Sequence, residues 1–234
     1  MREIKRINFS FSSKIERRVL VKIAKNLPSW VNPDMLTLLA LFSAAGICIS
    51  YVEAGKNSFY LLIASFLFFL HWFGDSLDGT LARVRKIERP RYGHYVDHLM
   101  DSISIALILG GLTISSLTST TIWLWVLVGF LLLMIEKMLF VSVKGEFFLS
   151  IGLIGPTEAR IAGILLNLLI FFSGNPLILP TLKLWKIETQ VRLVDLIGML
   201  ISFCLWFTLL IRALKVAALL NKEDSKLLSK KSKR

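Results

Sequence analysis

The chain has 234 residues, 55% of them hydrophobic, and a formal net charge of +12. This length predicts one domain. The apolar residues fall into long blocks separated by short charged or turn-rich segments, which excludes an ordinary soluble fold and is typical of a polytopic membrane protein. The basic residues flank these blocks, and that distribution favours an anionic membrane surface over nucleic acid as the partner.

The N-terminal segment, residues 1–33, carries no apolar stretch of the kind found in a signal peptide. Within it, residues 13–27 place basic side chains on one side of a helix and apolar side chains on the other. We expect a cytoplasmic segment with an amphipathic helix lying in the membrane interface. The alternative is a helix packed on the rest of the protein. Cys48 and Cys204 lie inside apolar blocks, so no disulfide framework is predicted.

Six apolar blocks predict spans of a bilayer, at about 35–52, 58–72, 95–114, 121–143, from after residue 157 to near 173–176, and 194–219. The second is expected to continue as helix through Asp75 and Asp78. The six blocks define a domain expected over 34–220, and the lysine-rich residues 221–234 predict a disordered basic tail. Lys and Arg are most frequent in alternate connections, which places both termini in the cytoplasm. The predicted fold class is all-α integral membrane, with six transmembrane helices preceded by an N-terminal amphipathic interfacial helix.

Four of the seven aspartates lie within residues 74–102, where the second span ends and the third begins. Asp75 and Asp78 are three residues apart, and Asp97 and Asp101 are four apart, so each pair follows one face of a helix. Carboxylates at a span end are functional-site candidates, and four close together need a positive charge between them. We predict a site near the cytoplasmic face for Mg²⁺ or Mn²⁺, with two ions expected.

The residue types around these aspartates suit metal-assisted phosphoryl transfer. A metal bridging a pyrophosphate would neutralise charge on the leaving group, and a carboxylate could accept a proton from an attacking hydroxyl. Arg83 and the basic loop after it would attract polyphosphate. The small residues Gly79, Ala82 and Gly93 either let helices approach closely or leave room for a flat ligand. The identity of the donor stays open at this point.

The pattern D-x2-D-G-x2-A-R-x9-G-x3-D-x3-D runs from Asp75 to Asp101. It resembles, at every specified position, the signature of the CDP-alcohol phosphotransferase (CDP-alcohol phosphatidyltransferase) family of membrane phospholipid synthases. The six-span layout also resembles that family, over roughly 30–220. The resemblance implies metal-dependent transfer of a substituted phosphate group from a CDP-linked donor to an alcohol hydroxyl, with release of CMP. One substrate would be a lipid, and the protein would be a homodimer among membrane lipids.

The resemblance also implies roles for individual residues. Asp75, Asp78 and Asp97 would bind the metal ions. Asp101 would face the same metals and act as the general base that deprotonates the acceptor. The cytidine nucleotide pocket would be lined by Gly79, Ala82, Arg83 and Gly93.

Two further details resemble the choline and ethanolamine phosphotransferase branch, namely Asp97-His98 and Thr157-Glu158. The chain is shorter than typical members of that branch, so the donor stays open between CDP-diacylglycerol and a CDP-amino alcohol. His98 is expected to support the aspartates or to pack. Glu158 and Arg160 either form an acceptor pocket beside the aspartates or join in a salt bridge at a helix start.

Two other functions would also use intramembrane carboxylates. A membrane prenyltransferase binds a prenyl diphosphate through Mg²⁺, but it needs a second aspartate-rich motif, and only Asp34, Asp195 and Asp224 lie outside the first cluster. A divalent-cation transporter would explain the carboxylates. It would leave the glycines and Arg83 of the signature without a role, and its site would be expected at broken spans near the midplane.

Overall fold

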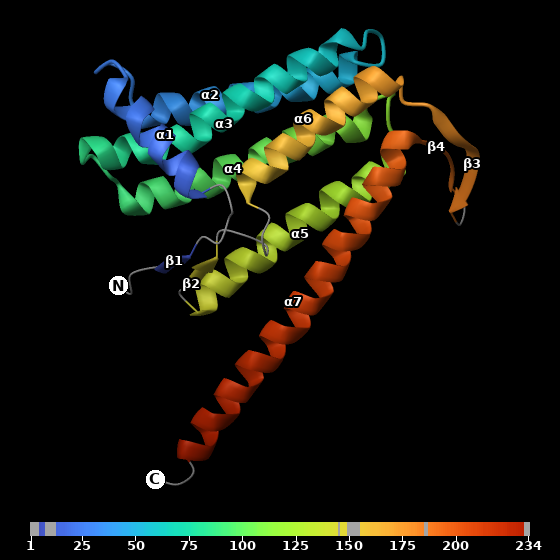
Figure 1. The fold of residues 1–234 in the computed structure, drawn as a ribbon. Coiled ribbons are helices and arrows are strands. Elements are labelled where there is room, and N and C mark those ends of the chain that lie inside the picture. Colours follow the sequence, from blue (N-terminus) through green and yellow to red (C-terminus); the bar gives the residue numbers. More distant parts are fainter. Residues whose placement is uncertain (1–4, 8–12, 145, 149–154, 185–186, 232–234) are drawn as a thin grey trace.

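The structure is a computed structural model, and it describes residues 5–7, 13–144, 146–148, 155–184 and 187–231. Six of its helices, α2 to α7, are long and apolar enough to cross a membrane. The predicted all-α membrane fold with an N-terminal helix is therefore confirmed. The elements in chain order (Figure 1) are β1 (Lys5–Ile7), α1 (Ser13–Asn26), α2 (Pro33–Glu53), α3 (Phe59–Arg85), α4 (Pro90–Ile114), α5 (Thr120–Lys144), β2 (Glu146–Phe148), α6 (Pro156–Ser173), β3 (Leu177–Leu184), β4 (Ile187–Arg192) and α7 (Leu193–Lys231).

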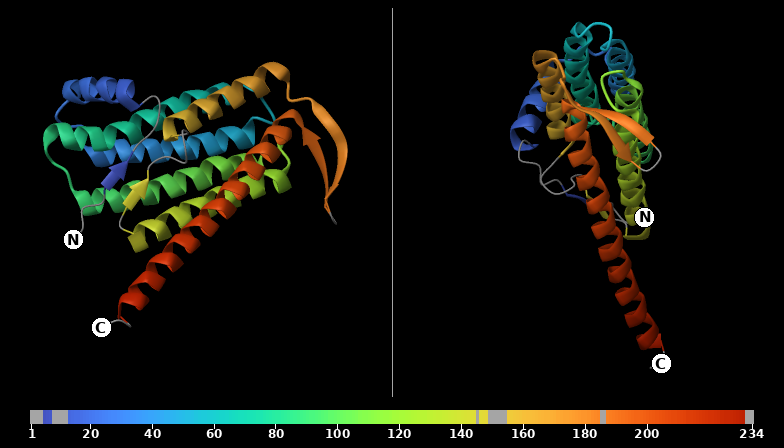
Figure 2. Two further views of the ribbon diagram at one scale, coloured as in Figure 1. Left: turned by 60° about the horizontal axis from the view of Figure 1, so that its bottom comes forward. Right: turned by 90° about the vertical axis from the view of Figure 1, so that its right-hand side faces the viewer.

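The spans pack in an order that differs from their order in the chain. Helix α2 packs against both α3 and α4, α6 packs on the other side of α3, and α5 joins α4 to α7. The lower part of α7 extends beyond the other helices (Figure 2). The antiparallel hairpin of β3 and β4 projects from the end of the bundle where α7 begins. Strand β1 pairs in parallel with β2. The sequence analysis expects no strands in these connections.

Short polar signals fix the turns at the other end of the bundle. Asn32 caps α2, since its Oδ1 accepts a hydrogen bond from the backbone N–H of Met35 at 2.9 Å. Helix α3 ends at Arg85 and is followed by Lys86, which has a φ of 58° and lies in the left-handed region. Pro90 then begins α4. The chain therefore reverses within residues 86–89, and the acidic ends of α3 and α4 become neighbours.

Two glycines let α2 come close to its neighbours. A Cβ on Gly74 of α3 would lie 2.5 Å from the carbonyl oxygen of Leu36, and a Cβ on Gly111 of α4 would lie 2.7 Å from the Cα of Cys48. Contacts this short leave no room for any side chain, so glycine is required at both positions. The close approach brings α3 and α4 to the same central helix.

Helix α1 packs on α3 through its apolar side. Leu20 and Ala24 are buried in one cluster with Leu77 and Leu81 of α3. The guanidinium of Arg85 donates hydrogen bonds to backbone carbonyls of the turn after α1, those of Leu27, Pro28, Ser29 and Val31. The basic side of the helix is exposed, at Arg17, Arg18, Lys22 and Lys25. The described contacts thus agree with the packed-helix alternative, and they leave the basic side facing outward.

The last helix is longer than the sequence predicts. The sixth span was expected to end near residue 219, with a disordered tail beyond it, whereas α7 continues to Lys231. After Gly198 the described part of α7 contains no glycine or proline, and its lysines, leucines and glutamate are good helix formers. Because nothing interrupts the helix, residues 221–231 extend it.

Candidate active site

The turn at residues 86–89 brings the two aspartate pairs together, as the spacing predicts. Asp75 and Asp78 lie on α3, and Asp97 and Asp101 lie on α4. Asp75 and Asp97 both lie within electrostatic range of Asp78 and of Asp101. The four carboxyl groups therefore form one cluster at the junction of two helices.

The α4 side of this cluster fits a divalent metal ion. Asp97, His98 and Asp101 each offer one ligand atom, and these atoms all lie within 4.8 Å of one another. The Nδ1 atom of His98 is 3.6 Å from Oδ2 of Asp97. Two carboxylates and one imidazole can bind Mn²⁺, and the carboxylates alone suit Mg²⁺. The sequence analysis placed His98 in support or packing, whereas its ring nitrogen lies in this group.

Asp75 is held by a cation from another helix. Arg160 of α6 places its Nη2 atom 2.5 Å from Oδ2 of Asp75, and its Nε donates to Nδ1 of His71 at 3.0 Å. Arg160 and His71 are both buried, with exposed fractions of 9% and 5%. The Nε2 atom of His71 has no hydrogen-bond partner within the described part of the chain. His71 has no partner nearby in the sequence, because Arg160 lies on a distant helix.

Asp78 is oriented by α2. Its carboxylate accepts hydrogen bonds from the hydroxyl of Thr37 at 2.7 Å and from the backbone N–H of Gly79 at 2.5 Å. Thr37 lies one turn after the first residue of α2, Pro33. Thr37 and Asp78 are 41 positions apart in the chain, so no local pattern predicts this contact.

Gly79 and Gly93, the glycines of the predicted nucleotide pocket, do not pack closely against a neighbouring helix. A Cβ built on Gly93 meets no described heavy atom within 4 Å, and one on Gly79 meets only the guanidinium of Arg83, at 3.5 Å or more. This differs from Gly74 and Gly111, whose neighbours are backbone atoms. Of the two interpretations of these small residues, helix approach and ligand space, the geometry at Gly79 and Gly93 favours ligand space.

The surroundings of Gly93 are basic and hollowed. Arg83 is exposed, and its Nη2 donates to the hydroxyl of Thr80 at 3.1 Å. A shallow, open hollow of about 480 Å³ is lined by Arg89, Pro90, Arg91 and Tyr92. The guanidinium carbon of Arg89 lies 4.1 Å from the centre of the Tyr92 ring. The fourth residue of the predicted pocket, Ala82, is half-buried on the last turn of α3.

The two residues of the predicted acceptor pocket differ in what they contact. Glu158 accepts a hydrogen bond from the backbone N–H of Gly155 at 3.0 Å and so satisfies a donor at the start of α6. Arg160, two residues later, reaches the aspartate cluster. Arg160 therefore lies against the predicted catalytic groups, while this hydrogen bond of Glu158 is with the start of its own helix.

Two further cations approach the cluster from α5 and α7. Lys137 lies within electrostatic range of Asp97, Asp101 and Arg212. Arg212 of α7 is paired with Glu136, with its Nε atom 2.7 Å from Oε2. A lysine in an otherwise apolar span marks Lys137 as unusual in the sequence. Its place near the aspartates follows only from the packing of α5 on α4.

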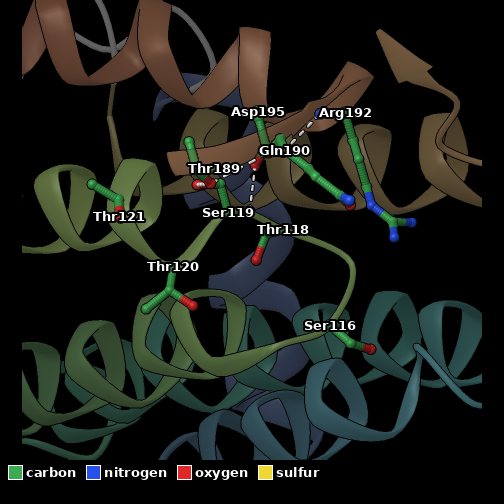
Figure 3. Close-up of a pocket in the computed structure, with 9 residues that line it drawn as sticks. All are labelled: Ser116, Thr118, Ser119, Thr120, Thr121, Thr189, Gln190, Arg192 and Asp195. Carbon is green, nitrogen blue, oxygen red and sulfur yellow. Dashed lines mark hydrogen bonds between the residues drawn. The ribbon is translucent and has the colours of Figure 1, made fainter. Parts of the chain in front are cut away.

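A separate cavity, of about 370 Å³, lies at the opposite end of the bundle, between the α4–α5 turn, β4 and the start of α7 (Figure 3). Its one carboxylate, Asp195, accepts hydrogen bonds from the backbone N–H groups of Ser119 and Arg192 and from the indole of Trp123, at 2.8, 2.9 and 3.1 Å. Asp195 is fully buried. It ties the start of α7 to α5, and the cavity contains none of the predicted site residues.

Comparison with known proteins supports the assignment from the sequence. A search of curated proteins found no match to this chain. The sequence model of the CDP-alcohol phosphatidyltransferase family matches residues 30–220, a range that contains the four aspartates, Arg160 and most of the six spans. Together with six apolar helices, this match indicates a multi-pass integral membrane protein. Because the match covers most of the chain, this protein belongs to the CDP-alcohol phosphatidyltransferase family, whose members transfer phosphate-containing groups.

Proposed function

We propose that this protein transfers a substituted phosphate group from a CDP-linked donor to an alcohol hydroxyl and releases CMP, as a step of phospholipid biosynthesis. The observation that carries the proposal is the group of Asp97, His98 and Asp101 on α4, whose ligand atoms lie within 4.8 Å of one another, with Asp75 of α3 close to Asp101. A cluster of carboxylates from two helices, with a cation on one side, suits the handling of a charged pyrophosphate at the edge of a membrane.

The metal site is assigned to Asp75, Asp78, Asp97 and Asp101, with two ions of Mg²⁺ or Mn²⁺. When bound, these ions would neutralise the charge that develops on the departing CMP. Asp78 would be held in place by Thr37, and Asp75 by Arg160. Hydrogen bonds of this kind orient carboxylates before a ligand binds.

The transfer itself is assigned to Asp101 as general base. The acceptor oxygen forms a bond to the phosphorus of the group to be transferred, and the bond from that phosphorus to the oxygen of CMP breaks. The hydroxyl proton passes to the Asp101 carboxylate, which must lie within hydrogen-bond reach of the acceptor. CMP leaves with the electron pair of the broken bond.

The nucleotide pocket is assigned to Gly79, Ala82, Arg83 and Gly93. The open space at Gly93 and the hollow of Arg89 to Tyr92 next to it support this assignment. Exposed guanidinium groups there suit phosphate recognition. On the far side of the aspartates, Arg160 is the group we assign to the acceptor pocket, and Glu158 stabilises the turn of helix that carries it.

The donor is either CDP-diacylglycerol or a CDP-amino alcohol, and the Asp97-His98 and Thr157-Glu158 pairs favour the second. We further propose that both termini and the active site lie on the cytoplasmic side, and that the protein works as a homodimer. The basic residues around the aspartate end of the bundle support the orientation.

The experiment is CMP release by the purified protein in detergent or liposomes. Each donor is offered with Mg²⁺ or Mn²⁺ and with candidate acceptors, soluble alcohols for CDP-diacylglycerol and diacylglycerol for CDP-ethanolamine or CDP-choline. A chelator arm and the Asp101→Asn variant serve as controls. Metal-dependent release with one donor class supports the proposal and identifies the branch. If no donor releases CMP above the Asp101→Asn background, the proposed activity is wrong.

A further inference from the structure

Helix α1 lies outside the range matched by the family, which begins at residue 30. It is nevertheless joined to the candidate active site through one carboxylate. The Oε1 atom of Glu16 accepts hydrogen bonds from the indole N–H of Trp72 at 2.7 Å and from the hydroxyl of Thr157 at 2.8 Å. A third and longer contact, at 3.5 Å, comes from the hydroxyl of Ser76.

These donors belong to the two helices that meet in the Asp75–Arg160 ion pair. On α3, Trp72 lies three residues before Asp75, so the two share a helix face, and Ser76 follows directly. On α6, Thr157 lies three residues before Arg160, again one turn away. Glu16 therefore bridges α3 and α6 within one helical turn of each partner in the ion pair.

The position of Glu16 is itself fixed by the packing of α1. The apolar contacts of Leu20 and Ala24 hold the middle of the helix on α3, and the hydrogen bonds of Arg85 hold the turn after it. A carboxylate on a docked helix loses little further freedom when it forms its bonds.

We infer that Glu16 is a positioning residue for the transfer reaction: it fixes the start of α6 against α3, so that Arg160 meets Asp75 in the geometry the reaction needs. The predicted effect of Glu16 on the rate of transfer rests on the proposed function. The α1 helix then completes the active site of the family domain as an added element, in addition to any contact with the membrane surface.

The test compares Glu16→Gln with Glu16→Ala. Glutamine keeps an oxygen that can accept the Trp72 and Thr157 hydrogen bonds, and alanine removes it. We expect Glu16→Ala to lower kcat for CMP release by about ten-fold, the lower end of the range for groups that orient ligand-binding side chains. Glu16→Gln should stay within about two- to three-fold of the wild type, because a neutral acceptor still makes the bonds. The matched control is Glu53→Ala, which removes a carboxylate at the other end of the bundle.

A double variant tests whether Glu16 acts through its contact with Thr157. Because Thr157→Val removes one of the same links, Glu16→Ala with Thr157→Val should be little slower than the slower single variant. Additive losses would overturn the inference, and so would equal rates for Glu16→Ala and Glu53→Ala. A Glu16→Gln variant as slow as Glu16→Ala would also overturn it.

Hydrogen exchange provides a readout that needs no turnover. We expect Glu16→Ala to speed exchange of the backbone amides in the first turn of α6, residues 157–160, while Glu53→Ala leaves it unchanged. If the wild type releases no CMP from any donor but this difference is found, the proposed function fails and the link between α1 and α6 stands. If the amides in the first turn of α6 exchange at the wild-type rate in Glu16→Ala, the link between α1 and α6 is wrong, whatever the CMP release.

Discussion

Arg160 and Asp75 form an ion pair between α6 and α3, with Nη2 and Oδ2 separated by 2.5 Å. A charged side chain inside a membrane span is costly unless it is paired, and each of these residues satisfies the other. The same guanidinium also donates to His71. The helix that carries two predicted metal ligands is therefore fixed to the helix expected to line the acceptor pocket.

The first prediction concerns this pair. Arg160→Gln keeps hydrogen-bond donors and removes the charge, which leaves Asp75 without its counter-ion. We expect loss of most CMP release and a stability loss of about 2 kcal/mol, below the range for fully buried pairs because Asp75 is partly exposed. Thermal unfolding in detergent and CMP release measure the two effects. Arg192→Gln, the same change at the opposite end of the bundle, should alter neither, and equal behaviour of the two variants would contradict the prediction.

The second prediction concerns the metal ligands. Asp75→Asn, Asp78→Asn and Asp97→Asn each remove a negative charge from the cluster, so metal-dependent binding of the CDP-linked donor should be lost. Mn²⁺ titration followed by electron paramagnetic resonance measures the metal, and equilibrium binding of labelled donor measures the nucleotide. Asp224→Asn, in the last part of α7, is the control. Wild-type Mn²⁺ affinity in all three site variants would remove these aspartates from the metal site.

The third prediction separates binding from proton transfer. Asp101→Asn keeps a similar shape but cannot accept the hydroxyl proton. We expect donor binding to persist and transfer to fall by at least about 100-fold, the usual effect of removing a general base. Donor binding and single-turnover CMP release are measured on the same preparation. Transfer at the wild-type rate would show that another group is the base.

The fourth prediction uses two glycines in different surroundings. Gly93→Ala adds a methyl group in open space, so the unfolding temperature should not change, while the KM for the donor should rise if this space belongs to the nucleotide. Gly74→Ala forces the new methyl group onto the backbone of α2, where its Cβ would lie 2.5 Å from the oxygen of Leu36. It should destabilise the protein by about 1–3 kcal/mol, as overpacking does. The reverse order of unfolding temperatures would contradict both assignments.

The fifth prediction concerns the membrane interior, where Tyr51 donates to Asn167 at 2.8 Å and Asn167 donates to Ser65 at 3.2 Å. Tyr51 and Asn167 are almost fully buried. Tyr51→Phe should cost about 1 kcal/mol of stability, because one interhelical hydrogen bond is lost. CMP release per folded molecule should stay unchanged, since this network lies away from the aspartates. A large fall in activity without a fall in unfolding temperature would show that the network reaches the site.

The sequence predicted the parts of this protein that depend on local patterns. Hydropathy located the spans: α6, for example, runs over Pro156–Ser173, where the predicted span begins after Thr157 and ends near residues 173–176. The spacing of Asp75, Asp78, Asp97 and Asp101 identified the cluster, because helical periodicity alone places such residues on common faces. The family match confirmed the resemblance over the range expected for it.

The partners of these residues could not be predicted, because they are distant in the chain. Arg160 reaches Asp75 across 85 positions, and Thr157 reaches Glu16 across 141. No local signal specifies such contacts. The strands β3 and β4 were missed for a different reason: Pro176 and Pro180 suggest an irregular loop, yet prolines are tolerated in an edge hairpin.

The length of α3 has a consequence for the surrounding bilayer. Asp75 lies 16 residues after Phe59, the first residue of α3, or about 24 Å along the helix axis, whereas the hydrocarbon core of a bilayer is about 30 Å thick. On α4, Asp101 lies only about 20 Å from the far end of its helix, at Ile114. With Phe59 and Ile114 at one edge of the hydrocarbon core, these carboxylates would lie inside its other edge. Either the bilayer would thin around α3 and α4, or water would enter it as far as the carboxylates. In both cases, the thickness of the host membrane would be one of the variables that set access to the site.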